Sequence, residues 1–363
     1  MAAFTERFDA QIEFLRGHVK TVVLGELDTG RVAVCPSIQG RVMTSCIPGR
    51  DGTGFGWINH DLVRSGPHLP HINPFGGEDR LWFGPEGGPF SLFFQDGKEQ
   101  VFEHWQTPAP IDSEAFEVVS EDGTEIVMRH KARLENAAGS VFDVELLRTV
   151  RIVEPVLPGG VTFESVNQVR NVGATSWQPE SGLLSIWVLG MFRSSPRAVA
   201  VLPYRDAEGT LVNDRYFGTV PADRLACTGK AILFRGDGRF RSKIGLSAVR
   251  AVPTIGAVDT EAGSLTLVTY PAVPAPNGYV DSMWGDQDDP FAGDVVNSYN
   301  DDGSLGGFFE LETSSPALDL ASGETAVHVH TTSHAIGPPG LLDEWTRSYL
   351  GVKLETVSAF VSP

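Results

Sequence analysis

Apolar and polar residues follow two different periods along the chain, and each period predicts its own kind of element. The first is helical, because Phe8, Ile12 and Leu15 recur every three or four residues before Gly17. The period then changes to two in short segments that glycines separate, such as KTVVLGEL, GRVAVCPSI and GRVMTSCI. Alternation of this kind is typical of β-strands with one buried face. We therefore expect a helical lead-in over residues 1–20 followed by strands.

The middle of the chain keeps the period of two. In TEIVMRHKARLEN the residues Ile126, Met128, His130, Ala132 and Leu134 share one face, and VFDVELLRTVRIV follows after a short turn, which predicts a hairpin. Turn signals separate further strand-like segments, and no alternating strand–helix pattern appears. The predicted fold is all-β, a large antiparallel β-sandwich. No linker-like composition divides it, so we expect one domain over residues 1–363.

Composition excludes some classes of partner. The formal charge of −18 argues against binding nucleic acid or an anionic membrane through general electrostatics, although a locally basic pocket for an anionic substrate stays open. No apolar run approaches the roughly 20 residues of a membrane span, and the N-terminal residues lack a signal-peptide core, so a cytoplasmic location is expected. The three cysteines lack disulfide-framework or zinc-site spacing, which predicts buried, reduced thiols. The sequence does not predict an oligomeric state.

The strongest chemical pattern lies near the carboxyl end, in GGFFELETSSPALDLASGETAVHVHTTSHA. Alternation puts Glu310 and Glu312 on one face of a strand, about 7 Å apart. Two carboxylates so close raise each other's pKa, which suits general acid/base chemistry. The same rule puts His328 and His330 on one face of the next strand. If that strand lay beside the first, imidazoles and glutamates would share a surface.

A metal site is one interpretation of this cluster. Two histidines at alternate strand positions, His328 and His330, could hold a divalent ion such as zinc, manganese or calcium, with a glutamate completing the set. The metal would act as a Lewis acid or hold a hydroxyl group. The competing interpretation is that both histidines make ordinary hydrogen bonds on a polar sheet face.

Residues 54–110 show no regular period and are rich in glycine, proline and aromatic residues. Long ordered loops in a compact domain are usually functional. Within residues 54–110, the candidates for acid/base or metal-ligand roles are His71 and His104. Candidates for binding a substrate are Glu78, Asp79, Arg80, Trp82 and Trp105. From later segments we add Trp284 and also Lys243, which shares a strand face with Arg241. For each of them a core or solvated position is the alternative.

Several of these motifs resemble the galactose mutarotase-like (aldose 1-epimerase) superfamily. FFELETSSPALDLASGETAVHVHTTSH is similar to its carboxy-terminal signature, and VNQVRNVGATSW followed by GLLSIWVLGMF is similar to its mid-chain strands. INPFGGEDRLWFGPEGG marks an uncharacterised branch. The resemblance implies a β-supersandwich with a concave, carbohydrate-binding face. It also implies that Glu312 is the catalytic base and that Arg80 binds sugar.

One departure from that superfamily changes the expected chemistry. The resemblance places a histidine acid in the segment GLLSIWVLGMF, where this chain has Ser185, Ile186 and Trp187. Another residue must then supply the acid. We expect a carbohydrate-active enzyme using general acid/base chemistry, of the epimerase, lyase or glycoside-cleaving type, with Trp82, Trp105 and Trp284 stacking on the sugar. The alternative is a non-catalytic carbohydrate-binding protein of the same fold.

Overall fold

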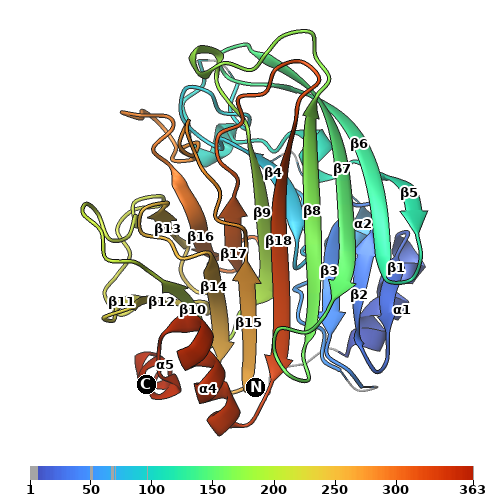
Figure 1. Cartoon of the computed structure of the whole chain (residues 1–363), viewed down its shortest axis with the longest axis vertical. Helices are drawn as coiled ribbons and strands as arrows, with labels where there is room; N and C mark the ends of the chain where they lie inside the picture. The colour runs from blue at the N-terminus through green and yellow to red at the C-terminus, as the bar shows by residue number, and fades with distance from the viewer. Residues whose placement is uncertain (1–6, 50–51, 67–68, 70, 96, 363) are drawn as a thin grey trace.

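Antiparallel sheets make up most of the molecule, as predicted (Figure 1). The computed structural model describes residues 7–49, 52–66, 69, 71–95 and 97–362. Over these residues it has a ten-stranded, a five-stranded and a three-stranded sheet. The ten-stranded sheet has the order β11 (Leu225–Cys227), β12 (Ala231–Arg235), β10 (Ala198–Pro203), β14 (Thr254–Asp259), β15 (Ser264–Thr269), β18 (Thr325–Ile336), β8 (Val161–Asn171), β7 (Val141–Val153), β6 (Glu125–Glu135) and β5 (Glu117–Glu121).

The five-stranded sheet carries the residues on which the rest of the argument depends. Its order is β13 (Ser242–Ser247), β16 (Asp294–Asn300), β17 (Phe308–Ser314), β9 (Ser185–Arg193) and β4 (Arg80–Gly84). One face packs on the ten-stranded sheet, because Leu311 of β17 joins a cluster that contains Phe234 of β12 and Ile255 of β14. Alternate residues of the same strands therefore point to the other side.

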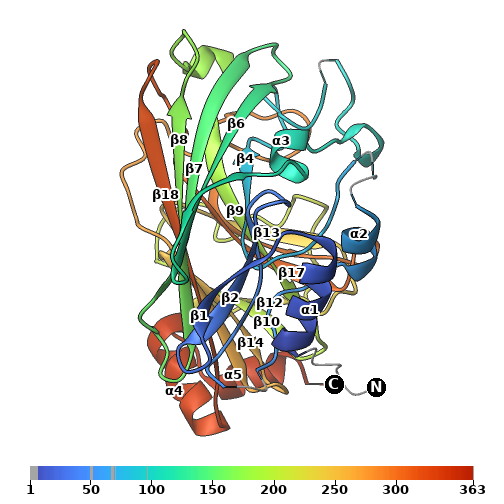
Figure 2. The ribbon, with the colours of Figure 1, turned by 90° about the vertical axis from the view of Figure 1, so that its right-hand side faces the viewer.

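Smaller elements pack around the two large sheets. The three-stranded sheet consists of β1 (Val22–Glu26), β2 (Gly30–Cys35) and β3 (Arg41–Cys46). The short helices are α1 (Phe8–His18), α2 (His60–Ser65), α3 (Ala109–Asp112), α4 (Pro339–Leu350) and α5 (Leu354–Phe360), with 3₁₀ turns at Phe102–His104 and Pro179–Ser181. Figure 2 shows α1 and α2 on one flank, where apolar residues of both helices share a cluster with β2 and β3.

Local predictions succeeded where the period was clear. The hairpin of β6 and β7 has its apolar positions buried as expected, and α1 buries Phe8, Ile12 and Leu15. Residues 1–6 of the predicted lead-in lie outside the described residues. The region 54–110 contains β4, which was not predicted, because all five residues of this strand are buried and alternation disappears when both faces are covered.

Other expectations have mixed outcomes. Cys35 and Cys46 are buried free thiols, but Cys227 is exposed, which corrects the expectation that all three are buried. In the described residues no helix is long and apolar enough to cross a membrane. The single-domain organisation stays a prediction.

Candidate functional site

A pocket lies on the face of the five-stranded sheet that points away from the ten-stranded sheet. Every strand of the sheet contributes to its floor, and loops form its rim. The floor residues are Lys243, Tyr299, Phe308, Glu310, Trp187, Leu189, Met191, Arg80 and Trp82. The rim residues are Ile72, Glu86, Phe102, Trp105, Phe217, Arg241 and Leu305. The pocket is open to solvent and encloses about 480 Å³ of empty space, part of it at the open mouth.

Strand register determines which charges meet in this pocket. Lys243 lies in one cross-strand row with Tyr299, Glu310 and Met191, whereas Arg80 lies in the next row with Leu189 and Glu312. Each cation nevertheless pairs with the carboxylate of the other row. Lys243 Nζ is 2.9 Å from Glu312 Oε2, and Arg80 Nη2 is 2.7 Å from Glu310 Oε1. Long side chains reach such diagonal partners, and here the two pairs cross the centre of the sheet.

Glu310 is the carboxyl group on the wall of the pocket. Its side chain is almost completely buried, and burial raises its pKa to about 7, with Arg80 opposing the shift and the charge of Glu312 adding to it. A carboxyl group with this pKa exists in both protonation states near neutral pH. It can therefore accept or donate a proton, as the adjacent pair of glutamates predicted.

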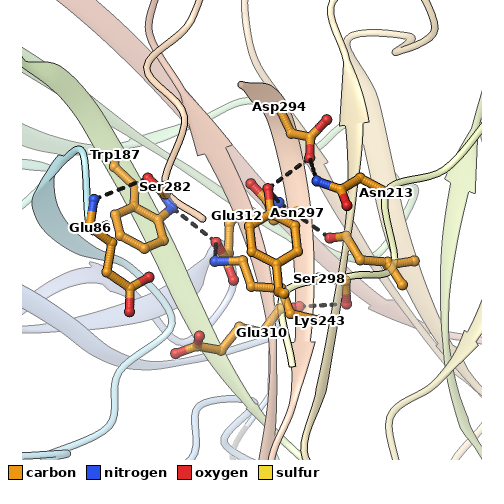
Figure 3. A network of polar contacts seen from close by, with 12 residues as sticks. Glu86, Trp187, Asn213, Lys243, Ser282, Asp294, Asn297, Ser298, Glu310 and Glu312 are labelled. Carbon is orange, nitrogen blue, oxygen red and sulfur yellow. Dashed lines mark hydrogen bonds and ion pairs between the residues drawn. The ribbon is translucent and has the colours of Figure 1, made fainter. Parts of the chain in front are cut away.

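Glu312 does not line the pocket, contrary to what the resemblance implied for a base that meets substrate. It is fully buried, and Figure 3 shows Lys243 and Trp187 converging on its carboxylate. Trp187 Nε1 donates to Glu312 Oε2 at 2.9 Å, the same oxygen that Lys243 contacts. Trp187 lies in the segment where the resemblance implied a histidine that acts as the general acid. This geometry makes Glu312 the anchor of Lys243 behind the pocket wall.

Glu86 is a second pocket carboxyl group that the sequence did not single out. Its Oε1 accepts a hydrogen bond from Trp284 Nε1 at 3.0 Å. Burial raises the pKa of Glu86, and the charge of Lys243 opposes that shift. The residues around Glu86, PEGG, match no motif with a known function. Its place at the pocket follows from the path of the chain over the sheet, which the sequence does not show.

Several buried donors at the pocket have no partner in the described structure. They are Nε and Nη1 of Arg80 and the indole nitrogens of Trp82 and Trp105. Leaving a buried donor unpaired costs about 1–3 kcal/mol, so such atoms mark positions where a polar ligand or water belongs. The guanidinium of Arg80 also lies 4.1 Å from the ring centre of Trp82, which holds it in place.

A polar network supports the far side of Lys243. Asp294 accepts hydrogen bonds from Tyr216 and Asn213, and burial raises the pKa of Asp294 to about 6 (Figure 3). The Lys243 ammonium lies 4.5 Å from the Trp187 ring centre and 5.2 Å from that of Tyr216. Two aromatic rings and one carboxylate thus hold the lysine in one orientation.

Trp284, predicted to stack on a sugar, does not line the pocket and reaches it through its hydrogen bond to Glu86. Four other predicted site residues lie away from this pocket. Glu78 accepts hydrogen bonds from Ser45 and lies 2.9 Å from His334 Nε2, and Asp79 pairs with Arg148, all fully buried. The prediction that Glu78 and Asp79 meet substrate therefore lacks support from the geometry. His71 and His104 do not line the pocket either. His71 Nδ1 contacts the carbonyl of Trp105 at 2.6 Å, and His104 is exposed.

His328 and His330 lie on the opposite side of β17 from the glutamates. Both imidazoles contact Thr313 Oγ1, at 2.8 and 2.9 Å, in the space between the sheets. Burial lowers their pKa values, to about 3 for His328 and about 4 for His330. The histidines and glutamates of the expected metal set therefore do not share a surface, since β17 separates them. The described residues hold no group of three or more His, Cys, Asp or Glu arranged to bind a metal.

Comparison with known proteins identifies the family. A family model, described as a family of unknown function (DUF6786), matches residues 6–361. The chain belongs to this family. A search of curated proteins finds no match to the DUF6786 chain.

Solved structures similar to this DUF6786 chain share its fold. A galactose mutarotase-like protein of Lactobacillus casei superposes with a TM-score of 0.54 at 10% identity, covering 87% of this chain and 100% of its own. A candidate aldose 1-epimerase of Escherichia coli K12 superposes with a TM-score of 0.53 at 13% identity, and the match covers 88% of this chain and 99% of the epimerase chain. A candidate mutarotase of Salmonella typhimurium superposes with a TM-score of 0.50 at 12% identity, and the match covers 90% of this chain and 100% of the mutarotase chain. The fold is galactose mutarotase-like, as the sequence motifs indicated.

Proposed function

We propose that the pocket binds a carbohydrate and that Glu310 and Glu86 exchange protons with it as an acid/base pair. The observation that carries the proposal is Glu310, a buried carboxyl group with a pKa of about 7 on the wall of an aromatic pocket. Similar folds in proteins described as mutarotases or aldose 1-epimerases support a sugar as the ligand.

The lining of the pocket suits a polyol with an apolar ring face. The rings of Trp82, Trp105 and Trp187 line the pocket, and flat aromatic side chains pack against the C–H face of a sugar ring. The unpaired donors of Arg80, Trp82 and Trp105 would be satisfied by ring and hydroxyl oxygens.

Ring opening at the anomeric carbon is the reaction that these two groups serve most directly. Glu310, ionised, takes the proton of the anomeric hydroxyl group as the bond from the anomeric carbon to the ring oxygen breaks. Glu86, whose pKa is raised by burial, gives a proton to the ring oxygen. Closure on the other face of the carbonyl reverses both transfers and yields the other anomer. Glu312 acts indirectly by holding Lys243.

A non-catalytic carbohydrate-binding protein is the second candidate. It is favoured by the burial of Glu312 beneath Lys243 and Trp187, since the residue that the resemblance assigns as base has no access to the pocket. Both candidates share the ligand class and differ only in turnover.

The two candidates are separated by measuring binding and anomer exchange together. Calorimetry with a panel of aldoses reports binding, and NMR saturation transfer between α and β anomers reports turnover. For the enzyme, Glu310→Gln should lower the exchange rate by about 10²–10⁴-fold with little change in binding. The exposed Glu208→Gln is the control. Binding without exchange selects the second candidate, and no binding by any aldose contradicts both.

A further inference from the structure

Arg241 is a cation of the pocket rim without a polar partner. It follows β12 in a loop and lines the pocket, yet no hydrogen bond or ion pair to another described residue is present, and its Nε is buried. Its guanidinium lies 4.3 Å from the ring centre of Phe217, 5.2 Å from Phe102 and 6.0 Å from Trp284. Three rings therefore surround this group and leave its donors free.

The other two cations of the pocket, Arg80 and Lys243, each form an ion pair. Glu310 pairs with Arg80 and Glu312 with Lys243, whereas Glu86 is held by Trp284. Arg241 influences Glu86 only through space, and less strongly than Lys243 does. Arg241 is therefore the one cation lining the pocket that forms no ion pair with a described residue, although its charge also acts from a distance on Asp302.

Arg80 provides a second, independent indication. Its side chain is 2% exposed and lines the same pocket, with Nη2 on Glu310 but with Nε and Nη1 unpartnered. Fixed guanidinium groups with free donors are the usual partners of planar or tetrahedral oxyanions, to which they donate two hydrogen bonds at once. A neutral sugar would leave the charge of Arg241 unmatched.

We propose that the pocket takes a sugar that carries a negatively charged substituent, with Arg241 as the residue that recognises this group. The inference rests on the proposed carbohydrate ligand and narrows it to acidic sugars. A carboxylate, as in a uronic acid, and a phosphate ester present the same oxyanion chemistry to a guanidinium group. Glu310 and Glu86 have other hydrogen-bond partners, and neither forms a hydrogen bond or ion pair with Arg241, so we assign Arg241 to specificity.

The test compares charged and neutral sugars of the same stereochemistry. Binding of D-glucuronate, D-glucose 6-phosphate and D-glucose, and of D-galacturonate and D-galactose, is measured by calorimetry at fixed ionic strength. We expect at least one charged sugar to bind tenfold or more tightly than its neutral counterpart. The charged sugar with the larger gain identifies the oxyanion as carboxylate or phosphate.

Variants assign the preference to Arg241. Arg241→Gln should reduce the ratio of charged to neutral affinity to about one, whereas the exposed Arg239→Gln, two residues away, should keep it. Equal binding of charged and neutral sugars by the wild-type chain overturns the inference but leaves the carbohydrate proposal standing. A preference that survives Arg241→Gln also overturns it. Absence of binding by every sugar, charged or neutral, contradicts the proposed function itself.

Discussion

Two glutamates that are equivalent in the sequence have different roles in the structure. Glu310 and Glu312 share a strand face, but the crossed ion pairs place Glu310 on the pocket wall and Glu312 behind Lys243. The reason is the register of the five-stranded sheet, which sets Arg80 and Lys243 in different rows. Substitutions at these residues therefore have distinct expected effects.

The raised pKa of Glu310 predicts the pH dependence of stability. A carboxyl group whose pKa rises from 4.5 to about 7 on folding stabilises the native state fully below pH 4.5, and this contribution is lost as pH rises through 7. Relative to Glu310→Gln, the wild-type free energy of unfolding should fall by up to about 3 kcal/mol between pH 5 and 8. Urea unfolding at both pH values measures it. Parallel profiles for the two proteins would contradict the assigned pKa.

Breaking the buried pair of Lys243 and Glu312 should cost far more than breaking a surface pair. Lys243→Met leaves the Glu312 carboxylate buried and unpaired, which costs about 3–5 kcal/mol. The double variant Lys243→Met/Glu312→Gln should recover part of this loss. In the control, Lys131→Met removes an exposed partner of Glu145 and should cost less than about 1 kcal/mol. Chemical denaturation supplies all three values, and equal losses for Lys243→Met and Lys131→Met would refute the buried-pair assignment.

At the scale of elements, alternation predicted which residues share a face but not which face is buried. On β18 the polar residues His328, His330 and Thr332 point into the molecule, whereas Val327 on the other face is 49% exposed. The buried imidazoles form hydrogen bonds with Thr313. On this strand the histidines are therefore buried and the valine is exposed, which reverses the usual preference. The expected cluster of histidines and glutamates failed for this reason.

These histidines predict acid sensitivity. Their pKa values fall from 6.5 to about 3 and 4 on folding, so the unfolded chain binds more protons and stability is lost as pH falls from about 6.5 towards 4. His328→Gln should flatten the fall in free energy of unfolding between pH 6.5 and 4.5, whereas the exposed His104→Gln should leave its slope unchanged. If both variants keep the wild-type slope, the histidines titrate normally in the folded protein.

At the scale of the whole molecule, buried ion pairs join the sheets. Arg148 of β7 contacts Asp79 beside β4, Asn167 of β8 and the carbonyl of Gly40 beside β3. This one side chain therefore links the three sheets at a fully buried position. Asp79, expected to bind substrate, instead positions the start of β4 and thus Arg80.

Asp79→Ala should destabilise the protein by about 3–5 kcal/mol, because it leaves the Arg148 guanidinium buried without its counter-ion. Thermal unfolding should show a lowered Tm, while Asp143→Ala, which removes the exposed partner of Arg133, should change it little. Similar Tm values for both variants would mean that Arg148 finds another partner and that the sheets do not depend on this pair.

Local periodicity in the sequence indicated most of the strands, the helix α1, the all-β class and the shared face of Glu310 and Glu312. It did not indicate β4, whose five residues are all buried. The sequence also indicated the placement of Arg80, Trp82, Trp105 and Lys243 at one site. Only the tertiary structure decided that Glu310 meets the pocket, that Glu86 joins it, and that His328 and His330 lie behind β17. Those outcomes depend on register and sheet packing between residues up to 230 positions apart, which no local pattern encodes.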